Sequence, residues 1–365
     1  MTKIKEVVDL LQQLAPLSYQ ESYDNSGLQT GNLHDEITGV LVTLDCTLAV
    51  LEEALAAGCN LIIAHHPVIF RPLKQLTGRS ETEQIIIKAI QNNLGIYACH
   101  TNLDNVLSGV NAKICEKIGL ENLKILSQKT GNLIKLVTFA PLENTNAILA
   151  AMHTAGAGQI GNYQNCSFWV SGIGSFKPGA EANPHIGEPG QQEEVAENRM
   201  EVIFPEHLKE KVVTALLAAH PYEEVAYDLY RLENANQEVG AGMLGDLPKS
   251  VPATEFMQQL KTKMQLNTVR HTNFENKQII KVAVCGGAGS FLIKDALRAG
   301  ADIFITADLK YHDFFIPEGK MILADIGHYE SEVFTKEIFY ENIIKKFSNF
   351  AVLKSKVNTN PVRYT

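Results

Sequence analysis

A short apolar run, residues 60–64, ends in two adjacent histidines, His65 and His66, and Pro67 then stops it. In α/β proteins, functional side chains gather at the carboxyl ends of strands. Neutral imidazole is a common ligand of transition metals, so two neighbouring histidines can contact two ions, or one ion and a substrate. Alternatively, His66 caps the turn and His65 is hydrogen-bonded in the core. The pair indicates a dinuclear metal site only if further ligands join it.

A second histidine and carboxylate pair follows the expected strand at residues 95–99. His100 and Asp104 belong to the segment His-Thr-Asn-Leu-Asp. Asp104 could bridge two metal ions, or it could form an Asx turn or a helix cap.

A third pair, His328 and Glu332, opens the helix after the expected strand at residues 321–325. Because these residues are four apart, both lie on one helix face, and Glu330 points elsewhere. The same spacing is frequent on solvated helices, where Glu332 would be an ordinary acid of the first turn.

Together, three strand ends supply a mixed set of nitrogen and oxygen ligands, which suits zinc, manganese or iron better than calcium or magnesium. The set is too large for one tetrahedral ion, and two divalent ions about 3.5–4 Å apart would use it. Such a pair performs hydrolysis through a metal-bound hydroxide. The predicted metal ligands are His65, His66, Asp104, His328 and Glu332.

Other polar residues could orient these ligands, bind substrate or transfer protons. They are Asp24, Asn25, His100, Asp308 and His312. The glycine-rich segment 286–290 could hold a phosphate on its amides, or form a tight strand-to-helix turn. The segment His-Pro-Tyr-Glu-Glu at 220–224 is interpreted as a packing and turn element, with ligand binding as the alternative.

Composition excludes several classes of protein. The chain has 365 residues, 45% of them hydrophobic, and a formal net charge of -9, which disfavours nucleic acid as the primary partner. No signal-type or membrane-spanning apolar stretch is present, so we expect a cytoplasmic protein with no membrane partner. The six cysteines stand singly, as expected for reduced packing residues.

Strands and helices alternate at both ends of the chain, which predicts a largely parallel, helix-covered sheet in an α/β/α domain built from two halves. The first half, 1–130, has expected strands at 39–44, 60–64 and 95–99, and helices at 48–57, 81–92 and 110–118. The second, 235–365, has strands at 279–285, 302–306 and 321–325, and helices at 291–299 and 332–347. Residues 53–63 align without a gap on 295–305, and His66 then coincides with Asp308. Either an internal duplication or chance explains this match.

Residues 131–234 interrupt that domain with the order β-α-β twice, the arrangement of a ferredoxin-like α+β domain. The expected strands are 133–139, 166–173, 200–204 and 225–232, and the helices are 144–155 and 206–220. Residues 174–198 are rich in glycine, proline and glutamate, which predicts an exposed loop or a disordered excursion.

The motifs I-x-x-H-H-P, H-T-N-L-D and G-H-Y-x-x-E, in this order, resemble those of the GTP cyclohydrolase 1 type 2-like family of dinuclear-metal proteins, also described as NGG-one-interacting-factor-three-like. The resemblance extends to residues 23–28 and 306–312, and the insert resembles the PII-like or CutA-like domain of the family's long members. It implies that the five predicted ligands bind two divalent metals, with Glu330 as the rival of Glu332. It also implies a toroidal homohexamer with its sites facing an internal cavity.

Two functions are consistent with these features. One is a metal-dependent hydrolase acting on a nucleotide, such as GTP, or on a similar small polar substrate. The alternative is a non-catalytic metal-binding or regulatory oligomer that senses a ligand or partner through the insert. A nucleic-acid hydrolase is a third reading, and the acidic balance counts against it.

Overall fold

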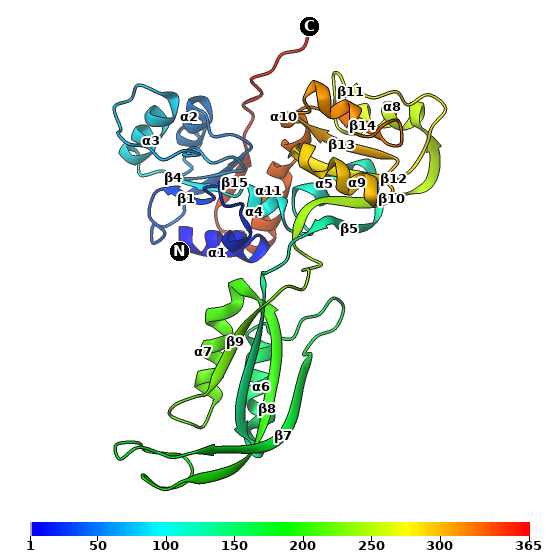
Figure 1. Ribbon diagram of the computed structural model, residues 1–365. Helices are drawn as coiled ribbons and strands as arrows, with labels where there is room; N and C mark the ends of the chain where they lie inside the picture. Colours follow the sequence, from blue (N-terminus) through cyan, green and yellow to red (C-terminus); the bar gives the residue numbers. More distant parts are fainter. Residues whose placement is uncertain (1) are drawn as a thin grey trace. The chain divides into compact units, whose positions relative to one another are not determined.

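The computed structural model describes residues 2–365, which form two compact units (Figure 1). One unit combines the residues up to Gln128 with Glu238–Thr365, and the other is the insert, Lys129–Gln237. The sequence predicts an insert at 131–234. No helix within residues 2–365 is both long enough and apolar enough to cross a membrane.

The first unit contains two sheets rather than the single, largely parallel sheet that the sequence predicts. In the first sheet, the order is β1-β4-β3-β2-β15, with β1 antiparallel and the others parallel. Its strands are β1 (Gly27–Thr30), β2 (Gly39–Thr43), β3 (Leu61–Ala64), β4 (Gly95–Ala98) and β15 (Ala351–Lys354).

In the second sheet, the order is β11-β14-β13-β12-β10-β5; β12 pairs with β13 and β13 with β14 in parallel, and the other neighbouring pairs are antiparallel. Its strands are β5 (Glu121–Gln128), β10 (Gly240–Pro252), β11 (Arg270–His271), β12 (Gln278–Ala288), β13 (Ile303–Ala307) and β14 (Ile322–Asp325). The two halves of the sequence therefore exchange edge strands: β5 comes from the first half, and β15 in the first sheet comes from the second. Hydrophobic periodicity identifies strands but does not say which strands pair, so this exchange was not predicted.

Helices cover both sheets of this unit. The largest core cluster joins the two sheets through α1 (Ile4–Leu14), α5 (Val110–Ile118), α8 (Ala253–Lys263) and α11 (Thr335–Lys346). Separate clusters pack α2 (Leu48–Ala56) and α3 (Glu81–Gln91) on the first sheet, and α9 (Ile293–Arg298) on the second.

The two sheets repeat one pattern. The order β1-β4-β3-β2 matches β11-β14-β13-β12, with an antiparallel edge strand and three parallel strands in each. Gly58 and Gly300, which coincide in the sequence match, both have left-handed backbone conformations, with φ of 70° and 72°. Both precede a central strand. The shared order and shared turns favour an internal duplication over chance.

The inserted unit has one antiparallel sheet of order β7-β8-β6-β9, with α6 (Thr145–Thr154) and α7 (Lys209–Ala219) packed on it through a core of its own. The chain order β-α-β-β-α-β is the split arrangement expected of a ferredoxin-like domain. Its strands are β6 (Leu133–Pro141), β7 (Ser167–Phe176), β8 (Glu193–Pro205) and β9 (Tyr227–Leu232).

The loop predicted at 174–198 is shorter in the structure, so both of its predicted bounds are wrong. Strand β7 continues to Phe176 and β8 begins at Glu193, so the loop spans only residues 177–192. Register Gly172↔Glu197 through Phe176↔Glu193 extends the hairpin of β7 and β8, and half of the residues in this part are exposed. Exposure alternates along the segment, but glycine and glutamate occupy several of the covered positions, so the sequence lacks the alternation of apolar residues that indicates a strand.

Candidate metal centre

Three strand ends place the five predicted ligands together. Register Ala64↔Ala98 aligns the ends of β3 and β4, so that His65 and His66 lie beside α4 (Thr101–Asp104), which ends at Asp104. The other sheet supplies α10 (His328–Glu332), which directly follows β14. Two groups of side chains have ligand atoms that all lie within 4.8 Å of one another: His65, Asp104 and Glu332; and His66, His328 and Glu332.

His65 is fully buried and is oriented by the backbone. Its Nδ1 lies 2.9 Å from the carbonyl oxygen of Cys99, so Nδ1 carries the proton and Nε2 holds the lone pair. That Nε2 lies 3.7 Å from Asp104 Oδ1 and 3.8 Å from Glu332 Oε1. His65 Nε2 and Asp104 Oδ1 are buried, and neither has a hydrogen-bond partner in the described chain. Buried polar atoms are rarely left unpaired, so a metal ion between these groups fits the structure.

His66 and His328 are oriented in the same way: each Nδ1 contacts an aspartate, and the two Nε2 atoms face each other. Nδ1 of His66 lies 2.7 Å from Asp45 Oδ1, and Nδ1 of His328 lies 2.7 Å from Asp308 Oδ2. Both Nε2 atoms lie 3.0 Å from Glu332 Oε2 and 3.4 Å from each other. Carboxylates on the outer nitrogens are the usual way in which proteins orient histidines that bind metal.

Glu332 is the residue shared by the two groups. Its Oε1 faces His65 and its Oε2 faces His66 and His328. The rival residue, Glu330, instead accepts a hydrogen bond of 2.9 Å from Asn360 Nδ2. The geometry also makes Glu332, more than Asp104, suited to bridging two ions.

Of the five supporting residues expected from the sequence, three lie at the cluster. The ring of His100 lies with those of His65 and His66 in a third group of ligand atoms within 4.8 Å, and its Nδ1 lies 2.7 Å from Asp24 Oδ1. His100 therefore offers a further nitrogen ligand, beyond the supporting role expected for it. Asp24 orients His100, and Asp308 orients His328.

The remaining two lie apart from the ligand atoms. The side-chain amide of Asn25 donates to the carbonyl oxygen of Ile69 at 2.6 Å. His312 packs its ring on Tyr311 and Phe315 in the short 3-10 helix Tyr311–Phe315. Sequence proximity to a strand end did not distinguish these two residues from Asp24 and Asp308.

Two contributors were missed from the sequence. Asp45 follows the end of β2, a position that could have drawn attention, and it orients His66. The C-terminal segment is the other: Thr359 Oγ1 donates to Asp45 Oδ2 at 2.5 Å, and Asn360 donates to Glu330. Its residues help to line a cavity of about 360 Å³ beside His66 and His328, together with Arg270, Asp308, Asp325 and Tyr364. A cavity of this size next to the cluster could admit a small ligand.

The pKa values of the clustered histidines and carboxylates are strongly shifted. Burial lowers the pKa of His65 to about 4. Burial opposes the charged form of His66 and His328 too, but hydrogen bonds to Asp45, Asp308 and Glu332 raise their pKa values to about 10 and about 9. Burial and the charge of Glu332 raise the pKa of Asp104 well above its usual value, whereas the histidines hold the pKa of Glu332 well below its usual value, against the effect of burial.

The first two amides of the glycine-rich segment 286–290 support the cluster and are not available to a phosphate. The amide of Gly286 donates to Asn111 Oδ1 at 2.9 Å, and the amide of Gly287 donates to Ser331 Oγ at 2.9 Å. These two donors are buried and already satisfied. Gly287 has a φ of 62°, and a Cβ atom there would overlap Glu332 Oε1. The segment therefore needs glycine to make room for Glu332.

The fold and the cluster define a class: an α/β protein with two similar sheets, an inserted ferredoxin-like unit, and a histidine and carboxylate cluster that could hold metal. The particular family follows from comparison with known proteins. The profile of the Duf34/NIF3 (NGG1p interacting factor 3) family matches residues 2–361, and the chain belongs to that family.

Relatives match over nearly the whole chain. A GTP cyclohydrolase 1 type 2 homolog of Halalkalibacterium halodurans is 39% identical over 366 residues, which cover 98% of each chain. A Bacillus cereus protein related to NIF3 has a TM-score of 0.86 and 35% identity, covering 100% of this chain and 99% of its own. Staphylococcus aureus protein SA1388 has a TM-score of 0.77 and 30% identity, with the same coverage.

Proposed function

We propose that this chain holds two divalent metal ions, of zinc, manganese or iron, and uses them to hydrolyse a nucleotide or a similar small polar substrate. The observation that carries the proposal is the pair of ligand groups that share Glu332. In one of these groups, the potential ligand atoms His65 Nε2 and Asp104 Oδ1 have no hydrogen-bond partner in the described chain. The mixture of imidazole and carboxylate suits these transition metals. Relatives bear the name GTP cyclohydrolase 1 type 2 homolog, which makes GTP the first substrate to test.

The residues divide into two half-sites. His65, Asp104 and Glu332 would hold one ion, and His66, His328 and Glu332 the other, with His100 as an additional ligand. When bound, such ions activate water and stabilise negative charge on a substrate oxygen. Asp45, Asp308 and Asp24 keep a proton on Nδ1 of their histidines, which directs each Nε2 toward the metal; on His66 and His328 the metal must first displace the Nε2 proton.

The cavity beside His66 and His328 supplies contacts for a polar substrate. Arg270 lines it, with its guanidinium donating to Asp325 Oδ2 at 3.0 Å, and Tyr364 lines it from the C-terminal segment. A guanidinium can hold an anionic group of a substrate by charge-assisted hydrogen bonds. Because the carboxylates of Asp45, Asp308, Asp325 and Glu330 also line this cavity, an anionic substrate would depend on the metal ions as well as on Arg270 for its binding.

A non-catalytic regulatory protein is the second candidate. The observation that favours it is the inserted unit, which has its own hydrophobic core and its own cavity and could sense a ligand. Its ferredoxin-like topology agrees with the proposed relation to PII-like or CutA-like domains.

We propose further that the chain acts in the cytoplasm as a toroidal homohexamer, with neither a membrane nor nucleic acid as its partner. Large apolar side chains on β7 support an assembly: Phe168 is 64% exposed, Trp169 48% and Ile173 75%. Light scattering coupled to gel filtration should then give six times the chain mass of 40.2 kDa. A monomer mass would remove the hexamer from the proposal.

Metal analysis combined with activity assays tests the function. Protein purified without chelator should carry about two metal ions per chain, as expected for a dinuclear site. Asp104→Ala should lose most of this metal, whereas Asp9→Ala, at an exposed surface ion pair with Lys5, should keep it. Each protein is then assayed against GTP and a panel of phosphoesters.

Each outcome selects a different function. Two metal ions with metal-dependent turnover, lost in Asp104→Ala, support the hydrolase. Two metal ions without turnover on any substrate favour the regulatory protein. Fewer than one ion per chain would mean that the histidines are structural, and both proposals would fail.

A further inference from the structure

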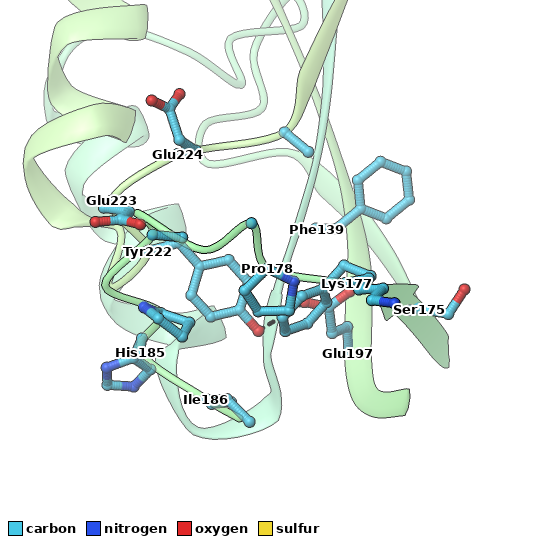
Figure 2. A pocket seen from close by; sticks show the side chains of 16 residues that line it. Phe139, Ser175, Lys177, Pro178, His185, Ile186, Glu197, Tyr222, Glu223 and Glu224 are labelled. Atoms are coloured by element: carbon cyan, nitrogen blue, oxygen red, sulfur yellow. Dashed lines mark hydrogen bonds between the residues drawn. The ribbon is translucent and has the colours of Figure 1, made fainter. Parts of the chain in front are cut away.

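The inserted unit contains a cavity of about 500 Å³ that plays no part in the proposed hydrolysis (Figure 2). Its walls come from the ends of β7 and β8, the loop 177–192, and the connection between α7 and β9. Its volume falls in the range of binding sites for small molecules. Most of the lining side chains are apolar or aromatic, including Phe139, Phe176, Pro178, Pro184, Ile186 and Tyr222.

A buried carboxylate lies in this apolar wall. Glu197, on β8, is only 8% exposed, and its Oε1 accepts a hydrogen bond of 2.8 Å from Tyr222 Oη, drawn in Figure 2. Within residues 2–365, no other side chain or backbone group donates to Glu197 Oε2, and no lysine, arginine or histidine nitrogen lies within 4.0 Å of the carboxylate. Buried charges in proteins are normally paired. A carboxylate that is largely buried and has no charged partner favours a cation as the ligand of this cavity.

Three aromatic rings pack near the ring of Tyr222, whose hydroxyl group contacts Glu197. The ring of Tyr222 lies 6.2 Å from Phe176, 6.0 Å from His185 and 5.0 Å from His220, measured between ring centroids. Aromatic faces attract organic cations, and proteins use groups of such rings to bind ammonium ligands. The cavity thus combines a charge with an apolar, aromatic surface.

The site is held in place by its neighbours. His220 accepts the backbone N–H of Tyr222 on Nδ1 at 3.1 Å and donates from Nε2 to the carbonyl oxygen of Phe139 at 2.8 Å. This fixes the backbone of Tyr222 at the rim. A Cβ atom on Gly174 would overlap Glu197 Oε2, so glycine leaves the space that the carboxylate occupies. Burial and the nearby Glu197 raise the pKa of Tyr222, which keeps its hydroxyl group a neutral donor.

The loop wall is also anchored. The backbone amide of Asn183 donates to Glu223 Oε1 at 2.9 Å, which ties the loop 177–192 to the segment that carries Tyr222. In Figure 2, the carboxylate of Glu224 points away from Tyr222; Lys177 and Pro178 are also among the residues that line the cavity. In the segment 220–224, His220 therefore holds the backbone in place, and Tyr222 forms part of the cavity wall.

We propose that this cavity binds a small organic cation, an ammonium or guanidinium ion with an apolar body, whose N–H groups donate to Glu197 Oε2. The apolar body would pack on Phe139, Phe176 and Ile186. A bare metal ion fits less well, because the groups of three or more potential metal ligands found within residues 2–365 all lie in the other unit. An anion is disfavoured by Glu197 and Glu223.

Calorimetric titration of the full-length protein with 2-phenylethylammonium chloride tests this proposal. Two probes of similar shape are titrated in parallel: neutral 2-phenylethanol and anionic 3-phenylpropionate. Glu197→Gln removes the charge but keeps an acceptor for Tyr222 Oη, so it should fold. Glu194→Gln is the matched control, because residue 194 lies on the opposite face of β8, is exposed, and does not line the cavity.

The expected result is saturable binding of the ammonium probe to the wild type and to Glu194→Gln, at least about tenfold weaker binding to Glu197→Gln, and no binding of the other two probes. Equal affinity of the wild type for the ammonium ion and the alcohol would overturn the proposal without any variant. Ammonium binding that persists unchanged in Glu197→Gln would place the ligand elsewhere, for example at the candidate metal centre, and would overturn it as well. The absence of ammonium binding to the wild type would also overturn it.

Discussion

Substituting alanine for Gly287 should weaken metal binding far more than an equally strained substitution elsewhere. Gly287 has a φ of 62°, and a Cβ atom there would lie 3.3 Å from His328 Cε1 and well inside the 3.0 Å limit from Glu332 Oε1. Relief of this overlap requires the carboxylate oxygen to move by more than half an ångström. Metal–ligand distances vary by only about 0.2 Å, so the displaced Glu332 would no longer bind metal properly.

Gly300→Ala is the matched control. Gly300 has a φ of 72°, and its Cβ atom would meet nothing within 4 Å. A left-handed conformation costs a residue with a side chain about 1–2 kcal/mol, so this part of the loss in unfolding free energy should be similar in the two variants. Only Gly287→Ala also moves Glu332. We expect its metal affinity to fall about 10- to 100-fold, the loss seen when a group that orients a ligand is removed, which corresponds to about 1.4–2.7 kcal/mol.

The assay is a competition titration of metal-free protein with zinc and a chromogenic chelator. Denaturant unfolding of the same samples measures the loss of stability separately. The reasoning is refuted if Gly287→Ala binds zinc as tightly as Gly300→Ala, because Glu332 would then not depend on the space that Gly287 leaves.

Three further predictions concern the same centre. Asp45→Asn should weaken zinc binding about 10- to 100-fold, because Asp45 orients His66. Asp308→Asn should weaken it by less, because the side chain of Asp308 is 52% exposed and that of Asp45 only 32%. Equal losses in the competition titration would contradict this prediction. Glu332→Gln should reduce the metal content to less than one ion per chain while Glu330→Gln leaves it unchanged, as measured by elemental analysis. In metal-free protein, His66 and His328 have pKa values of about 10 and about 9 and are protonated at neutral pH, so metal must displace their protons and its affinity must fall as pH falls. Calorimetry in two buffers of different ionisation enthalpy should detect this proton release, and its absence would count against metal binding at these histidines.

The cavity of the inserted unit and the candidate metal centre can be tested independently of each other. The cavity belongs to the inserted unit and the metal ligands belong to the other unit. A variant such as Glu197→Gln can therefore be examined for metal content, which should not change. A regulatory role for the insert would then appear as an effect of the ammonium probe on turnover that Glu197→Gln abolishes.

Local patterns in the sequence were enough to locate the elements that carry the cluster. Apolar runs of strand length ended where the strands β3 and β14 end, and the four-residue spacing put His328 and Glu332 on one face of α10, with Nε2 and Oε2 3.0 Å apart. The same spacing argument separated Glu332 from Glu330. The predicted strand ends and the shared helix face are confirmed because strand and helix periods depend on residues close together in the chain, whereas the choice of Glu332 as a ligand stays a prediction.

The tertiary structure alone decided which distant residues meet. The strands β5 and β15 join sheets whose other members lie far away in the sequence, and Thr359 contacts Asp45 across 314 positions. The sharing of Glu332 between two groups of ligands and the lack of a charged partner for Glu197 likewise depend on packing between separate elements. No local period encodes such contacts, because folding selects them by burial and hydrogen bonding over the whole unit.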